Sequence, residues 1–137
     1  MRLQGWESRL ADYLNGERKK AFVWGENDCI LFAARAADCV VDRDLTQEIE
    51  GYGRYNEARA HEILDEYGGE IEGIFDRHFD RRDNMLLAQR GDIATVKFGA
   101  MKAAGIIDTT GRLVACKTKT GLIHVPISHA ITVWEVV

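Results

Sequence analysis

A long apolar run over residues 30–41 follows directly on a cysteine, Cys29. Its charged exceptions are Arg35 and Asp38. A helix that is apolar on nearly every face lies in the middle of a domain. The sequence therefore predicts a central helix over about residues 27–41, and the rest of the chain must pack around it.

The start of this predicted helix can hold a reactive thiol. Asn27 can cap the helix, because its side-chain oxygen accepts from the first free backbone N–H groups. Cys29 then lies in the first turn, where the positive end of the helix dipole stabilises a thiolate. A thiol whose pKa falls below the usual value of about 8.5 becomes a usable nucleophile. The alternative is that Cys29 is a small buried apolar residue, as free cysteines commonly are.

Length, charge and cysteine usage narrow the class of protein. The 137 residues suit a single domain, which we expect to span residues 1–137. A net charge of −4 argues against nucleic acid as a partner, because binding to phosphates favours a basic face. The three cysteines cannot all pair, and their spacing matches no zinc signature. We expect reduced thiols, no metal and no cofactor.

No part of the sequence suggests a membrane segment. No apolar run approaches the length of a spanning helix, and the first residues lack the apolar centre of a signal peptide. The expectation is a protein that carries no export signal and no membrane-spanning segment. If it meets a cell wall, something else must carry it there.

Three further patterns at helical spacing occur in the first half of the chain. One amphipathic helix is expected to stop at Asn15-Gly16, and another to run over about 56–67. A third has an apolar stripe from Ile71 to Phe79. Residues 42–53 are polar and are expected to be irregular.

The periodicity then changes to that of strands. Strands are expected over residues 93–98, 103–107, 113–117, 122–127 and 130–136. Short links make neighbouring strands antiparallel, and Pro126 marks an edge or a bulge because it cannot donate to a ladder. The predicted fold is α+β, with N-terminal helices, including the central Cys29 helix, packed on a C-terminal antiparallel sheet.

Two motifs make the chain similar to a known group of enzymes. Trp24-Gly25-x-x-Asp28-Cys29 resembles the nucleophile motif of the NlpC/P60 cysteine peptidases, whose fold is papain-like. The run 90–93, Arg-Gly-Asp-Ile, resembles the Gly-Asp that opens their first core strand. Other short runs resemble a branch of small phage tail proteins, the DUF6950 type: Gly53-x-Tyr55, Gly68-Gly69, residues 104–107, residues 121–126 and Trp134.

This resemblance implies a phage tail protein near the tail tip, made in the host cytoplasm and carried in the virion. Its partners would be other tail-tip proteins, and active members cut the peptide part of host peptidoglycan. Cys29 would attack the scissile carbonyl, and a histidine would accept the thiol proton. Backbone N–H groups at the helix start would stabilise the oxyanion.

The histidine of active relatives is missing from its usual place. It opens their second core strand two residues before a glycine, and here Ala103 stands in that position. Alanine has no basic nitrogen, and loss of a triad member costs several orders of magnitude in rate. His124 and His129, on or beside late strands, are the candidate replacement bases. His61 and His78 precede the sheet and are poorer candidates.

The residues around Cys29 also have structural interpretations. Trp24 is expected to anchor the core under the turn, and Gly25 to supply a positive φ. Asp28 is expected to be a charge at the helix N-terminus rather than a catalytic acid.

Three functions stay open. The first is a structural component of the tail tip or of tail assembly, which keeps the hydrolase fold while its chemistry is lost or weakened. The second is an active virion-carried cysteine endopeptidase or amidase with Cys29 as nucleophile. The third sets the resemblance aside and interprets the chain as a cytosolic α+β binding domain with a buried cysteine.

Overall fold

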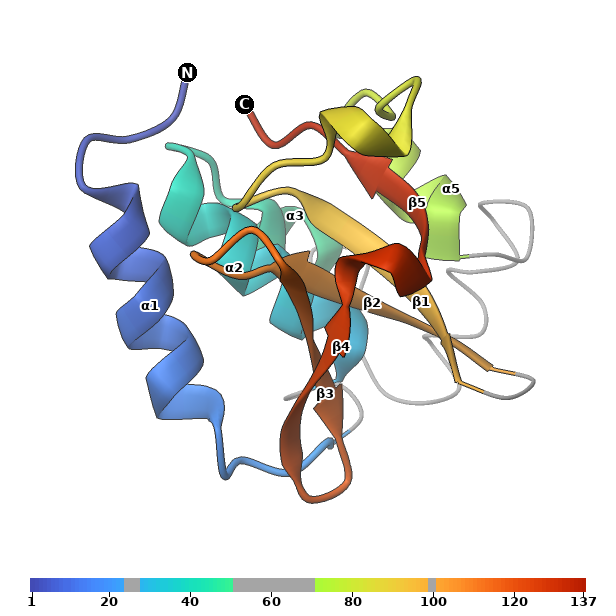
Figure 1. Ribbon diagram of the computed structural model, residues 1–137. Coiled ribbons are helices and arrows are strands. Elements are labelled where there is room, and N and C mark those ends of the chain that lie inside the picture. Colours follow the sequence, from blue (N-terminus) through green and yellow to red (C-terminus); the bar gives the residue numbers. More distant parts are fainter. Residues whose placement is uncertain (24–27, 51–70, 99–100) are drawn as a thin grey trace.

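The computed structural model describes residues 1–23, 28–50, 71–98 and 101–137 (Figure 1). Within these ranges the helices come first and the strands last, which confirms the α+β prediction. The elements in chain order are α1 (Trp6–Glu17), α2 (Cys29–Val40), α3 (Leu45–Glu50), α5 (Ile71–Asp76), the 3₁₀ turn η1 (Met85–Leu87), β1 (Ile93–Phe98), β2 (Met101–Ile107), β3 (Leu113–Thr118), β4 (Gly121–Pro126), the 3₁₀ turn η2 (Ile127–His129) and β5 (Ala130–Trp134).

The strands form one antiparallel sheet in the order β4-β3-β2-β1-β5. Strands that follow one another from β1 to β4 are antiparallel neighbours in this sheet, as the short links between them predicted. Pro126 ends β4, an edge strand, so its missing N–H breaks no ladder and the sequence prediction is confirmed. From there the chain crosses to the other edge through η2. Ile127 and Ala130 pack against the apolar cluster on the face of the sheet away from α2.

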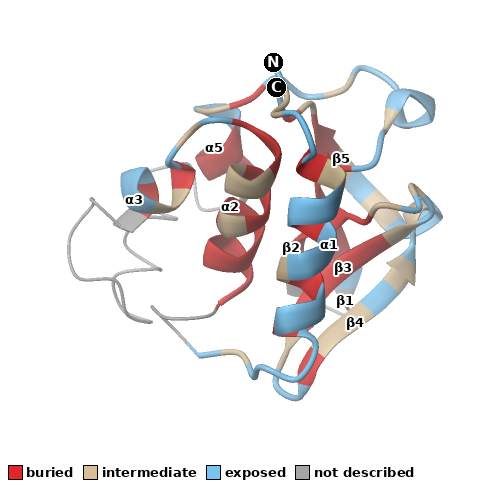
Figure 2. Ribbon diagram, turned by 90° about the vertical axis from the view of Figure 1, so that its left-hand side faces the viewer, coloured by how far each residue is buried: buried red, intermediate tan, exposed pale blue. Residues whose placement is uncertain are grey.

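The central helix predicted from the apolar run is α2. It contacts α1, α3, β2 and β3, and Figure 2 shows it almost entirely buried while α1 exposes its outer side. Alternate residues of the strands face it, since neighbouring side chains of a strand point to opposite faces. The strand residues in its cluster are Ile93, Ala104, Ile106, Ala115 and Trp134.

A short helix occupies part of the segment predicted to be irregular. Leu45 and Ile49 of α3 are fully buried against α2. The carboxylate of Asp38, at the end of α2, accepts from the backbone N–H groups of Leu45 at 2.8 Å and Thr46 at 3.1 Å. The prediction of irregular structure for 42–53 is therefore wrong over α3. The Asp44 side chain also accepts from the backbone N–H of Gln47 at 3.1 Å, so two aspartates satisfy free N–H groups at the helix start.

α1 also runs one residue beyond the predicted stop at Asn15-Gly16, to Glu17. The buried ammonium of Lys117 donates to the main-chain carbonyls of Glu17 at 3.1 Å and Lys20 at 2.9 Å, so it satisfies C-terminal groups of the helix. The same ammonium pairs with the Glu17 carboxylate at 2.7 Å. The helix predicted over 56–67 lies outside the described residues.

The Gly-Asp motif places a buried carboxylate directly before β1. Asp92 is fully buried and pairs with Arg2 at 2.9 Å and Arg82 at 3.0 Å. It also accepts from the backbone N–H groups of Gln89 at 2.9 Å and Val136 at 3.3 Å. This Asp92 cluster therefore ties both ends of the chain to the first strand.

Candidate functional site

The residue that caps α2 is Asp28, and the prediction that Asn27 does so is wrong. Asp28 is extended (φ −88°, ψ 174°), and its carboxylate accepts from the backbone N–H of Leu31 at 2.9 Å. A carboxylate satisfies a free N–H of the first turn and favours the positive end of the dipole. Asp28 therefore lies at the helix N-terminus, as predicted, and it is fully buried.

Cys29 is the first residue of α2, and its thiol is protected from water. Only 9% of the residue is exposed. Burial, together with the neighbouring Asp28 carboxylate, raises the pKa of the Cys29 thiol to about 11. Backbone hydrogen bonding at Ala104 and in the first turn of α2 acts in the opposite direction but does not compensate. Of the two interpretations of Cys29, the structure therefore favours the buried apolar residue, because desolvation outweighs the effect of the helix start.

The side of β2 that faces Cys29 is apolar. Ala104 is fully buried in the α2 cluster. Ala103 is partly buried and packs against the apolar clusters of both faces of the sheet. Thr95 lies opposite Ala104 in the β1–β2 register and is fully buried. Its hydroxyl has no hydrogen-bond partner among the described residues. At this register position β2 contributes a methyl group and β1 a hydroxyl.

The two candidate bases lie elsewhere on the sheet. His124 is exposed on β4, opposite Ala115 in the register. β4 is separated from β2 by β3, so at a strand spacing of about 4.8 Å the two are roughly 10 Å apart. His129 is exposed in η2, on the crossing between the edge strands. In the described part of the chain no histidine hydrogen-bonds to Cys29 or is among the groups that shift its pKa.

Several predicted residues lie outside the described part of the chain. They are Trp24, Gly25, Asn27 and His61, so the roles expected for Trp24 and Gly25 stay predictions. The three cysteines are free thiols, as predicted. Within the described ranges no group of three His, Cys, Asp or Glu side chains could hold a metal ion. None of the described helices has the length and apolar character needed to cross a membrane.

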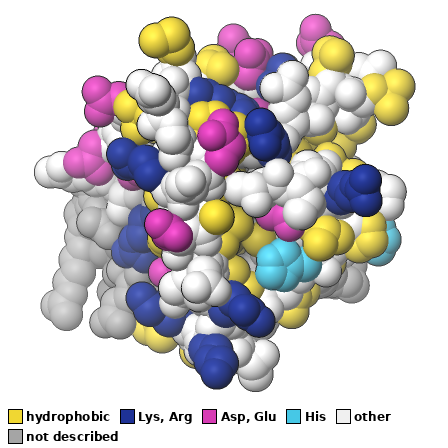
Figure 3. Space-filling view, turned by 60° about the vertical axis from the view of Figure 1, so that its left-hand side comes forward, with side chains coloured by type: hydrophobic (Ala, Val, Ile, Leu, Met, Phe, Trp, Pro, Cys, Tyr) yellow, Lys and Arg dark blue, Asp and Glu magenta, His cyan; other side chains and the backbone are white. Residues whose placement is uncertain are grey.

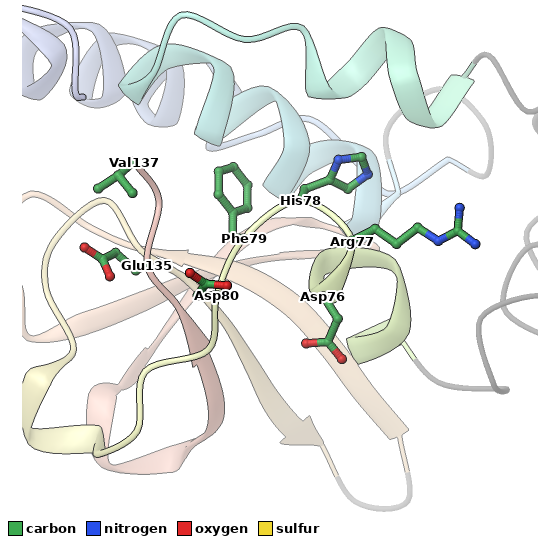
Figure 4. Close-up of a pocket in the computed structure, with 7 residues that line it drawn as sticks. All are labelled: Asp76, Arg77, His78, Phe79, Asp80, Glu135 and Val137. Carbon is green, nitrogen blue, oxygen red and sulfur yellow. The ribbon is translucent and has the colours of Figure 1, made fainter.

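A hollow of about 280 Å³ lies on another part of the molecule (Figure 4). Residues 76–80, which end α5 and follow it, form one wall, and Glu135 and Val137 form the other. Cys29 is not among the lining residues. The Asp76 carboxylate is held by Arg81 at 2.8 Å and by the indole N–H of Trp134 at 3.0 Å. The hollow is therefore separate from the Cys29 site.

Sequence reasoning missed a polar cluster beside this hollow. His78 contacts Arg43 and Glu48 there, although Arg43 lies 35 positions away from it in the sequence. The apolar stripe from Ile71 to Phe79 predicts a helix that includes His78, but α5 ends at Asp76. No local pattern links His78 with Glu48, so only the packing of α3 could reveal the cluster.

Figure 3, which shows the face that carries α1, has acidic and basic side chains interspersed. A phosphate-binding surface would instead concentrate positive charge. The class defined by the fold and the site is an α+β domain with a cysteine at the start of its central helix. The chain belongs to the family described as "Domain of unknown function (DUF6950)", whose model matches residues 1–136. A search of the curated proteins finds no match.

Proposed function

We propose that this protein is a structural component of a phage tail tip, or of tail assembly, built on a degenerate NlpC/P60 fold. The observation that carries the proposal is the surroundings of Cys29. The thiol lies at the start of the buried helix, as in a papain-like enzyme, yet apolar groups of β2 face it. The position has kept its cysteine, while the proton acceptor is missing from the described residues.

The raised thiol pKa argues against efficient catalysis. With a pKa of about 11, the thiolate fraction at pH 7 is on the order of one molecule in ten thousand. A cysteine peptidase overcomes this barrier with an adjacent imidazole that takes the proton. Loss of such a base costs several orders of magnitude in rate. A binding or assembly role requires none of this chemistry.

A rigid apolar turn offers a surface for contact with other tail proteins. Leu86 in η1 is 90% exposed, and Met85 and Leu87 beside it are also exposed. The turn is held from within, because the Asn84 side chain accepts from the backbone N–H of Leu86 at 2.9 Å. Exposed apolar residues on a fixed backbone are typical of protein contact sites.

Deletion of the chain from its phage tests the proposal. We expect defective or absent tails, and restored assembly when wild-type protein or Cys29→Ala is supplied. The matched control is Cys39→Ala, which removes a half-buried thiol away from the helix start. Electron cryo-microscopy of the complemented virions should place the chain at the tail tip. Normal tails in the complete absence of the chain would rule out the assembly role.

The second candidate is a virion-carried peptidase or amidase that cleaves host peptidoglycan. It is favoured by one observation, which is that Cys29 occupies the first helical position against the backbone of β2. His124, His129 or a group from a partner chain would then have to supply the base. The test is release of peptides from purified peptidoglycan. Activity abolished by Cys29→Ala but not by Cys39→Ala would support it, and equal activity in wild type and Cys29→Ala would end it.

A further inference from the structure

The loop that follows α5 is fastened to α3 through His78. The imidazole Nδ1 lies 3.0 Å from the Glu48 carboxylate of α3. The Arg43 guanidinium, from the link between α2 and α3, donates to the His78 main-chain carbonyl at 2.7 Å. It also stacks on the neighbouring ring of Phe79, 4.8 Å from the ring centroid. The contacts of His78 and Phe79 thus join the loop after α5 to α3 and to the link between α2 and α3.

The two neighbours of Nδ1 require different forms of the ring. Glu48 can accept from Nδ1 only when this nitrogen carries a hydrogen. Arg43, whose Nη2 lies 3.4 Å from Nδ1, can donate to it only when the nitrogen is bare. Because the contact with Glu48 is shorter and Arg43 already bonds the carbonyl, we assign a hydrogen to Nδ1, and the neutral ring is then the Nδ1–H tautomer.

The other ring nitrogen determines what an added proton would cost. The His78 side chain is 9% exposed, and its Nε2 is buried with no partner among the described residues. In the neutral ring Nε2 is a bare acceptor. Protonation would place an N–H there, in a buried position without an acceptor, and a positive charge beside Arg43.

We propose that His78 is a pH-sensitive latch, which holds the loop after α5 against α3 while the imidazole is neutral and loosens when it is protonated. The charged groups that face the ring in the described structure are Glu48 on α3, Arg43 on the α2–α3 link and Arg77 on the loop itself. Burial lowers the pKa of His78, and the attraction of Glu48 opposes this effect.

The latch also bears on the hollow of Figure 4. The loop that carries His78 forms one wall of the hollow, and Figure 4 shows the imidazole pointing away from Asp76, which lines the same wall. Loosening of His78 from α3 would therefore change the shape of the hollow. This consequence follows from the position of the loop and does not depend on the function proposed above.

Hydrogen exchange of α3 tests the latch. The amides of residues 45–50 are measured from pH 7.5 to 5.5, a range in which carboxylates with an ordinary pKa of about 4 stay ionised. After correction for intrinsic rates, we expect wild-type α3 to exchange about threefold or more faster at pH 5.5. His78→Gln, which cannot titrate, should lose this acceleration. His124→Gln removes an exposed histidine and should keep it.

A second measurement covers the case in which His78→Gln does not fold. The His78 ring is titrated by NMR in the wild type and in Glu48→Gln. We expect a midpoint below 6.5 in the wild type and a lower one in Glu48→Gln, since the variant lacks the charge that favours the imidazolium. A midpoint at or above 6.5, a wild-type α3 whose exchange ignores pH, or acceleration that persists in His78→Gln would each overturn the latch.

Discussion

Asp92 and Cys29 are two buried ionisable groups at the starts of two core elements, and they illustrate opposite outcomes of burial. Asp92 has two arginine partners and two backbone donors, so its negative charge is matched from several sides. Among the described residues, Cys29 has backbone donors and a neighbouring carboxylate, which disfavours a second negative charge. A buried group keeps its charge only where the fold supplies partners.

This difference separates a site that stabilises charge from a site that stabilises a neutral group. The partners of Asp92 come from both ends of the chain, and the cluster stabilises the fold. Around Cys29 the packing favours the neutral thiol, which behaves as a small apolar core residue. An assembly role needs the first site intact and makes no demand on the second.

The largest expected effect is that of Asp92→Ala. The substitution leaves the guanidinium groups of Arg2 and Arg82 partly buried without their partner, at a cost of about 3–5 kcal/mol. Denaturant unfolding followed by circular dichroism measures the change. Asp83→Ala, at an exposed neighbouring position, is the control and should stay within about 0.5 kcal/mol of wild type. A small effect at Asp92 would mean that its ion pairs contribute little to the stability of the fold.

Thiol labelling as a function of pH tests the other side of the comparison. The thiolate fraction of Cys29 rises about tenfold per pH unit below its pKa of about 11, so labelling should be about a hundredfold faster at pH 9 than at pH 7. At pH 7 the half-buried Cys39 should react first. Mass spectrometry of the labelled peptides resolves the sites. Rapid, pH-independent labelling of Cys29 at neutral pH would mean an activated thiolate.

A smaller effect is expected when Cys29 is given a partner. Ala103→His introduces the residue type that the resemblance to NlpC/P60 peptidases implies at this position. If the proposed kinship is right, the new imidazole should speed Cys29 labelling at pH 7 by about tenfold, which corresponds to a drop of about one unit in the thiol pKa. Lys97→His adds a histidine at an exposed place on β1 as a control. Equal labelling in the two variants would count against the kinship.

Much of the fold could be read from local patterns. The apolar run predicted α2. The alternation after residue 93 predicted the first and last residues of the strands to within about two positions. Pro126 located an edge of the sheet. Each of these features depends on side chains a few positions apart, so the sequence carries the signal directly.

The site could be predicted only in part. The sequence placed Cys29 in the first turn of the central helix, and the structure confirms this position. It did not give the correct cap, the direction of the thiol pKa shift or the helix α3. The cap is Asp28, the residue directly before the first helical position, and the start of α3 is fixed by backbone N–H groups that donate to the carboxylates of Asp38 and Asp44.

By itself, the sequence determined where the central helix and the strands form and that Cys29 lies in the first turn of that helix, because periodicity and turn chemistry act over short distances. Only the tertiary structure decided which charges are matched and which groups are desolvated. Asp92 meets Arg2 across 90 positions, and the thiol of Cys29 meets β2 across more than 70. The cost of burying a charge depends on everything packed around it, and that packing is a property of the whole fold.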